Sequence, residues 1–228
     1  MGLRDWWSKR RQTKQKEDAT TELFRLFDEG LMTGKEAPKY RETAMGLLGK
    51  GADVNARKIS PLFLLRRQED IAFAVEQLKM DPNSRDTGDE TLLHVLSREP
   101  TGKNLESIKW LVEHGAKIDV QDKQGNLPLH YVSNRDVAEY YDSLGADFTK
   151  KNKDGLTPLE LMKKRYEVMK SLGEKDFGFG KASDFCKALE ETIPFMKGEK
   201  GISPVSTQKV PSNNAIDNAL QKAKEKEM

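Results

Sequence analysis

Apolar residues recur every three or four positions in several short blocks along the chain, and polar turns separate these blocks. Residues 38–48, 105–112 and 135–144 each show this spacing, which is typical of an amphipathic helix with one buried face. Shorter apolar stretches, Leu92–Ser97 and Pro128–Ser133, precede the second and third blocks. The pattern predicts an all-α chain in which short helices come in pairs.

The glycine-rich stretch Met45–Ala56 (MGLLGKGADVNA) follows the first block and raises the question of a phosphate-binding loop. Such a loop needs G-x-x-x-x-G-K-[ST] after a buried strand, because its backbone amides wrap phosphates and its hydroxyl holds a metal ion. Gly49 and Lys50 fit the centre, but Ala44 occupies the first glycine position and Gly51 the hydroxyl position. The stretch also follows a predicted helix. We therefore interpret Gly51 as a left-handed residue that ends this helix.

Two short motifs recur together along the sequence. The first reads GADVNA, KMDPNS, GAKIDV and GADFTK, and its copies begin at residues 51, 79, 115 and 145. The second reads SPLF, TLLH, LPLH and TPLE, and its copies begin at residues 60, 91, 127 and 157. Each repeating unit thus contains a short helix, a turn, a second helix and a polar connection. A unit of this size cannot bury its apolar face alone, so neighbouring units must stack.

These motifs, with a period near 33 residues and two helices per unit, resemble the ankyrin repeat. The resemblance covers about Thr20 to Arg165. It implies a curved solenoid of stacked antiparallel helix pairs, with short hairpin-like fingers that project from the ends of the pairs. One departure from the pattern is Lys79, which takes the place of the capping glycine.

The ends of the chain differ from the repeats and suggest three regions. Residues 1–18 are expected to be a basic, flexible segment, and the first repeat helix is expected to begin at a capping Thr20 or Thr21. Residues 19–196 form the predicted repeat domain, whose open end the apolar pattern of residues 183–195 closes as a capping helix. Residues 197–228 are polar and charged, and we expect a disordered tail.

Bulk composition limits the classes of function. The net charge is only +2, so no overall excess of base favours nucleic acid as a partner. The single cysteine, Cys186, suits a reducing compartment, and its position in the helical pattern suggests a core thiol. With no apolar run long enough to span a bilayer, we expect a cytoplasmic protein.

Residues that could support catalysis each have a structural alternative. His94 and His130 end the second motif, where the resemblance implies hydrogen bonds to turn backbone, and His114 precedes the capping Gly115. Asp86-Thr87-Gly88 matches the aspartic-protease triplet, but that chemistry needs two carboxylates and there is one copy. We expect Asp86 to form a turn. No zinc-ligand spacing occurs, and we expect no catalytic residue, no metal and no cofactor.

The resemblance implies that a partner protein meets the finger tips and the exposed side of the first helices. The residues placed there are Arg57, Lys58, Arg66, Arg67, Arg85, Asp89, Glu90, Arg98, Lys123, Gln124, Asn126, Tyr131, Ser133, Lys151 and Lys153. Basic residues outnumber acidic ones in this set, so an acidic segment of a partner is the expected ligand. The leading hypothesis is a monomeric, non-enzymatic protein-interaction module.

The N-terminal segment leaves alternatives open. Trp6 and Trp7 stand next to Lys9, Arg10 and Arg11, a combination that suits a membrane interface, a nuclear import signal or a partner groove, or that is simply a solvated tail. A regulatory subunit anchored to a membrane through this segment is therefore an alternative function. The polar tail at the other end also resembles tails of effectors that intracellular bacteria deliver into host cells, which gives a second alternative.

Overall fold

The computed structural model describes residues 3–29, 37–56, 60–172 and 182–196. The α-helices are α1 (Leu3–Asp28), α2 (Ala37–Gly49), α3 (Gln68–Ala72), α4 (Leu92–Ser97), α5 (Leu105–Glu113), α6 (Arg135–Ser143), α7 (Pro158–Leu172) and α8 (Ala182–Met196). Short helical segments are η1 (Pro61–Leu64), η2 (Phe73–Gln77) and η3 (Pro128–Tyr131). No β-strand occurs in these ranges, so the all-α prediction is confirmed.

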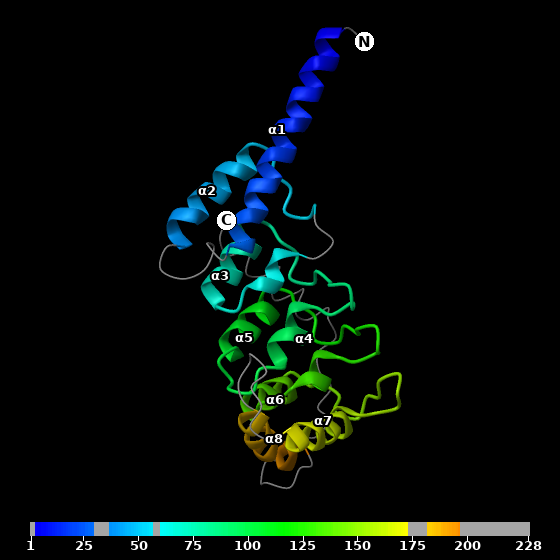
Figure 1. The fold of residues 1–228 in the computed structure, drawn as a ribbon. Coiled ribbons are helices and arrows are strands. Elements are labelled where there is room, and N and C mark those ends of the chain that lie inside the picture. Colours follow the sequence, from blue (N-terminus) through cyan, green and yellow to red (C-terminus); the bar gives the residue numbers. More distant parts are fainter. Residues whose placement is uncertain (1–2, 30–36, 57–59, 173–181, 197–228) are drawn as a thin grey trace, which may run out of the picture.

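The helices are arranged as pairs that follow one another along an elongated stack. In chain order the pairs are α1 with α2, η1 with α3–η2, α4 with α5, η3 with α6, and α7 with α8. The two helices contact each other in the pairs α1–α2, α4–α5 and α7–α8 (Figure 1). The first elements of successive pairs contact one another in turn, as α1 with η1, η1 with α4, α4 with η3, and η3 with α7. One hydrophobic cluster extends from Ala19 to Leu189 through every pair. The solenoid that the repeats predict is therefore present.

A left-handed residue ends the second helix in each of the first four pairs. Its φ is 87° at Gly51, 60° at Lys79, 90° at Gly115 and 75° at Gly145. After Gly51, the Ala52 N–H donates to the Leu47 carbonyl at 3.0 Å, the wrapping bond of a Schellman cap. The glycine-rich stretch is therefore a helix end, as predicted, and Lys79 adopts the glycine conformation despite its side chain.

The second helix of the second pair is one residue longer than its counterparts. Eleven residues lie between its N-cap Arg67 and Lys79, whereas ten lie between Asn104 and Gly115. The extra residue lies in the wide π-helical turn η2, where the Leu78 N–H bonds the Phe73 carbonyl at 3.2 Å. Both helix ends thus keep their places in the stack.

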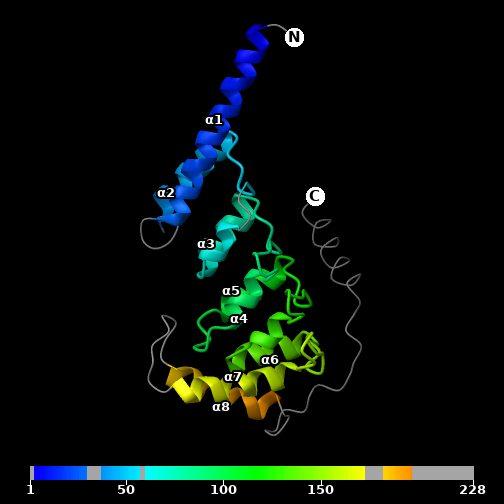
Figure 2. The ribbon, with the colours of Figure 1, turned by 45° about the vertical axis from the view of Figure 1, so that its right-hand side comes forward.

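The first helix begins much earlier than predicted. It runs without a break from Leu3 to Asp28, so Thr20 and Thr21 lie inside it and do not cap it. Instead, the Thr20 hydroxyl accepts a hydrogen bond from the Asp53 N–H at 2.9 Å and ties α1 to the turn after α2. The expected boundary at residues 18 and 19 is not an element boundary, and in Figures 1 and 2 the N-terminal part of α1 extends away from the stack.

The expected capping helix is α8, which packs on α7 and α6. Leu189 and Thr192 are buried, while Cys186, expected in the core, is half-buried. Burial nevertheless raises the pKa of the Cys186 thiol. The predicted disordered tail, residues 197–228, lies outside the described residues.

Candidate protein-binding face

The polar connections at residues 85–90, 121–126 and 151–156 form fingers of one shared design. Each finger begins with an aspartate or asparagine whose Oδ1 accepts the N–H groups two and four residues later. For Asp122 these donors are Gln124 and Asn126, both at 2.8 Å. The same pair of bonds occurs at Asp86 and at Asn152, at distances of 2.8 to 3.0 Å. Asp86 is therefore a turn residue, as predicted.

The three fingers are joined to one another through their backbones. The Lys123 N–H donates to the Gly88 carbonyl, and the Lys153 N–H donates to the Gln124 carbonyl, each at 2.9 Å. The lysine ammonium groups repeat the pattern, because Lys123 Nζ bonds the Thr87 carbonyl at 2.5 Å and Lys153 Nζ bonds the Lys123 carbonyl at 2.8 Å. The result is a continuous ledge of finger tips, which we call the finger ledge (residues 85–90, 121–126 and 151–156).

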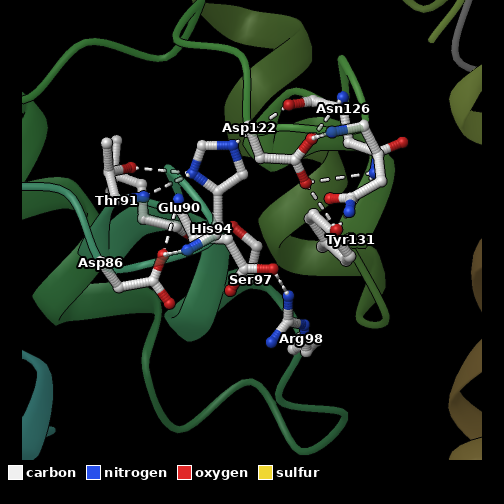
Figure 3. A network of polar contacts seen from close by, with 12 residues as sticks. Asp86, Glu90, Thr91, His94, Ser97, Arg98, Asp122, Asn126 and Tyr131 are labelled. Carbon is white, nitrogen blue, oxygen red and sulfur yellow. Dashed lines mark hydrogen bonds and ion pairs between the residues drawn. The ribbon is translucent and has the colours of Figure 1, made fainter. Parts of the chain in front are cut away.

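His94 fixes the junction between one first helix and the next finger. Its Nδ1 accepts the Thr91 N–H at 2.9 Å, so its Nε2 carries the proton and donates to the Asn126 carbonyl at 3.2 Å (Figure 3). The ring is fully buried, and this burial lowers the pKa of His94. The side chain is thus neutral and structural, as its motif position implies.

The other two histidines are also held by their own repeats. His130 Nδ1 accepts the Leu127 N–H at 3.1 Å, and burial lowers its pKa in the same way. His114 stacks on Trp110 with 3.7 Å between ring centroids, and its Nδ1 lies 2.8 Å from the Trp110 carbonyl. His130 thus bonds turn backbone, and His114 contacts the end of its own helix, as their sequence positions predict.

A polar network links the base of the finger ledge to the first helices. The Tyr131 hydroxyl donates to Asp122 Oδ2 at 2.6 Å, and Asn126 Nδ2 donates to the same carboxylate oxygen at 3.1 Å (Figure 3). Asn152 Nδ2 then donates to Asn126 Oδ1 at 2.7 Å. Burial alone would raise the pKa of Asp122, but these hydrogen bonds outweigh it and lower that pKa. Burial and the Asp122 contact raise the pKa of Tyr131.

Two arginines lie over this network. Arg98 forms an ion pair with Glu90 and stacks on Tyr131, with 4.2 Å from its guanidinium carbon to the ring centroid. Arg165 donates to the Tyr131 carbonyl and to the Ser133 hydroxyl, each at 2.9 Å. Burial, with the charge of Arg98, lowers the pKa of Arg165 to about 10. Among the described residues Arg165 has no carboxylate partner, so part of its hydrogen-bonding capacity stays unused.

The structure divides the predicted face into exposed and buried members. The exposed ones are Arg66, Arg67, Arg85, Lys123, Gln124, Lys151 and Lys153, and the half-buried ones are Asp89, Glu90, Arg98 and Tyr131. Asn126 and Ser133 are buried and hold the network together, so placing them on the exposed face was wrong. Arg57 and Lys58 lie outside the described residues.

The sequence did not assign Arg165 or Asp122 to this face. Asp122 occupies the first position of a finger, where its spacing from Asn126 gives a turn signal but no sign of the contact with Tyr131. Arg165 comes from the long helix α7 and reaches back over the preceding repeat. Only the stacking of α7 on η3 brings it there.

The described residues contain neither a metal-binding cluster nor a helix that could span a membrane. No group of three or more histidine, cysteine, aspartate or glutamate side chains there could hold a metal ion. Of the helices with described bounds, none combines the length and the apolar character that crossing a bilayer requires.

Comparison with known proteins gives matches in the repeat region. The family model described as "Ankyrin repeats (many copies)" matches residues 100–140. A putative ankyrin repeat protein of Rickettsia felis is 30% identical over 168 residues, which cover 66% of this chain and 68% of that protein.

Shorter matches extend to other sources. The human protein phosphatase 1 regulatory subunit 27 is 40% identical over 72 residues, 30% of this chain and 47% of that protein. Putative ankyrin repeat protein L271 of Acanthamoeba polyphaga mimivirus is 43% identical over 63 residues, 26% of this chain. The matched segments span 9% of the mimivirus protein and less than half of the human one.

Proposed function

The chain belongs to the ankyrin-repeat family, and from this we propose that it is a non-enzymatic, monomeric module that binds a partner protein. Repeats of this family generally mediate protein–protein interaction. The partner contacts the finger ledge and the neighbouring concave side of the first helices. This proposal rests on the backbone hydrogen bonds that join neighbouring fingers. These bonds hold exposed side chains of three repeats in fixed positions. Preorganised side chains lose little conformational entropy on binding.

The charges of the face favour an acidic segment as the ligand. Arg66, Arg67, Arg85, Lys151 and Lys153 are all exposed. The guanidinium of Arg66 donates to the carbonyls of Phe63 and Leu65 at 2.6 and 2.8 Å, so it is held in place before a partner binds.

Charge reversal at the exposed part of the face tests the proposal. We expect Arg67→Glu, Arg85→Glu and Lys151→Glu together to weaken partner capture at least about tenfold, since contacts between opposite charges become repulsive. Proteins captured from a cell extract by the wild-type chain would be identified by mass spectrometry. Their affinities would then be measured with purified partner.

A control with the same change in charge separates this effect from net charge. Lys39→Glu, Lys103→Glu and Lys117→Glu remove three exposed lysines that lie outside the predicted face. Partners lost from the first variant and kept by this control support the proposal. Equal capture by wild type and both variants would rule out the finger ledge as the binding face.

The name of one relative suggests what such binding serves. The human relative is called a regulatory subunit of protein phosphatase 1. A chain that regulates another protein by occupying part of its surface needs no catalytic group of its own. We therefore propose a regulatory role through binding, and an assay of the purified complex would show whether the partner's activity changes.

A second candidate function is a regulatory subunit anchored to a membrane, and it depends on α1 and not on the finger ledge. The observation in its favour is that Trp6 and Trp7 are exposed, at 45% and 53% of their surface. Delivery into a host cell would rest on the composition of residues 197–228 alone, and a translocation reporter fused to that segment tests it. Cytoplasmic location stays a prediction that cell fractionation can check.

A further inference from the structure

Most of the N-terminal part of α1 lies beyond the other described elements, and only near its end does Lys16 approach Gly51 in the turn after α2. Residues 4–18 are all exposed, whereas Ala19, Leu23 and Leu26 further along the same helix are buried. Figures 1 and 2 show this part of the helix extending away from α2 and from the rest of the stack. A short helix without tertiary contacts is marginal in water, so a binding surface would stabilise it.

The exposed helix carries its tryptophans and several cations on one side. At about 100° per residue, Trp6, Trp7, Arg10, Arg11 and Lys14 fall within an arc of about 140°, which we call the tryptophan patch. The guanidinium of Arg10 lies over the Trp6 ring at 5.1 Å, and the two indoles meet edge to face at 5.0 Å.

The tryptophan patch contains cations and no acidic residue. Asp5 is the only acidic residue among the first 16, and by helical spacing it falls on the side opposite the patch. Lys9 and Lys16 also fall on that opposite side. The patch ends where Asp18 and Glu22 continue the same side of the helix. Its charge is therefore uniformly positive over about two turns.

We propose that the tryptophan patch docks on an anionic phospholipid surface. Indole rings are stabilised at the boundary between headgroups and acyl chains, because the ring is apolar while its N–H is polar. Flanking arginines and lysines keep their charges at the headgroups, where anionic lipids attract them. The long projection of α1 lets this patch lie on a flat surface while the solenoid stays in solution. This inference rests on the membrane-anchored alternative and is independent of the finger ledge.

A folded acidic protein is the competing partner, and the layout of the patch favours lipid. Interfaces between proteins gain most of their energy from a few anchors in pockets of a shaped partner surface. The patch instead presents two adjacent indoles on the surface of a single helix. By helical spacing, Arg10 and Lys14 fall between the two indoles and Arg11 falls beside Trp7. A soft interface admits both rings without needing a matching pocket.

Vesicle binding by the full chain tests the inference. Vesicles of phosphatidylcholine alone are compared with vesicles of phosphatidylcholine and phosphatidylserine. We expect binding only to the mixed vesicles, weakened by salt, with a blue shift of tryptophan emission. Trp110 is 9% exposed and held in the core, so the shift reports on Trp6 and Trp7.

Two matched pairs of substitutions on α1 locate the contact. Each cation at an anionic surface is worth about a fivefold factor in affinity, so Arg10→Gln with Lys14→Gln should weaken binding about 25-fold. Lys9→Gln with Lys16→Gln removes the same charge from the opposite side and should weaken it less than fivefold. Replacing both Trp6 and Trp7 by alanine should abolish the blue shift. Circular dichroism would show that each variant keeps its fold.

Three results would overturn the inference. One is a lack of binding to mixed vesicles even at low salt. Another is an equal loss in the two charge pairs, which would mean attraction by net charge alone. The third is that the wild type captures a partner protein through Arg10 and Lys14, so that changing both residues loses this partner, while the wild type does not bind vesicles. The variant with Arg67, Arg85 and Lys151 reversed should still bind vesicles, so failure of the finger ledge and failure of the patch are distinguishable.

Discussion

At the scale of single residues, Lys79 has a left-handed backbone, with φ of 60°, where the other repeats have glycine. This conformation costs a residue with a Cβ about 1 kcal/mol or more, and the side chain of Lys79 is exposed. We expect Lys79→Gly to raise the free energy of unfolding by about 0.5–1 kcal/mol, after the greater entropy of glycine in the unfolded chain is subtracted. Urea denaturation measures the change.

A second lysine provides the control for this substitution. Lys117 is exposed like Lys79, but its φ is not positive. Lys117→Gly should therefore lower stability through backbone entropy alone. Stabilisation by both substitutions, or by neither, would contradict the strain assigned to Lys79.

Two buried histidines make the stability of the fold depend on pH. Burial lowers the pKa of His94 and of His130 below the ordinary value of 6.5. As the pH falls through that value, the unfolded chain takes up protons that the folded chain excludes, so stability decreases. The decrease is at most about 1.4 kcal/mol per pH unit for each histidine.

Replacing both histidines by asparagine should flatten this pH dependence, because asparagine keeps an acceptor for the backbone N–H and does not titrate there. Free energies of unfolding at about pH 7.5 and about pH 5.5 give the slope for each chain. An unchanged slope in the double variant would show that other groups cause the pH dependence.

At the scale of elements, the finger that begins at Asp122 shows how one side chain holds a connection in place. Its carboxylate accepts hydrogen bonds from two backbone amides, from Asn126 Nδ2 and from the Tyr131 hydroxyl. We expect Asp122→Ala to cost about 2–3 kcal/mol, since the buried donors lose their acceptor. Asp122→Asn should cost less than Asp122→Ala, because the asparagine Oδ1 can still accept both backbone amides, as Asn152 does, while its Nδ2 cannot accept from Asn126 or Tyr131.

Amide hydrogen exchange would locate the effect of these substitutions. In the alanine variant, the amides of Gln124 and Asn126 should exchange faster, while those of α2 stay protected. Equal costs for alanine and asparagine would mean that the backbone bonds between fingers, and not this carboxylate, hold the turn.

The same elements show what a sequence reveals and what it leaves out. Local rules predicted the helix end at Gly51 and the turn at Asp86, because backbone conformation there depends on neighbouring residues. The start of α1 at Leu3 was missed, since polar helical residues have no apolar spacing to mark them. The burial of Ser133 was also missed, because Arg165 covers it from a helix 32 residues away.

At the scale of the whole molecule, one apolar core passes through all the helix pairs and ends beneath α8. Leu189 in α8 is fully buried, so Leu189→Ala should lower stability by about 2–4 kcal/mol. In a solenoid each pair contacts only its neighbours, so the loss should appear first as faster amide exchange in α6 and α7. Leu64→Ala, at a residue that is 54% exposed, is the matched control and should change little. Uniform loosening from α1 to α8 would instead mean that the stack unfolds as a single unit.

The wide turn η2 lets a helix contain one more residue while it still ends at the same point of its repeat. The chain between Arg67 and Lys79 holds one more residue than its counterparts, and the turn absorbs this residue as a local widening before the left-handed end at Lys79. Repeats of unequal length can therefore be joined in one array without a shift in phase. For engineering, this turn is the position at which we expect the repeat to tolerate removal of a residue or insertion of a foreign helix.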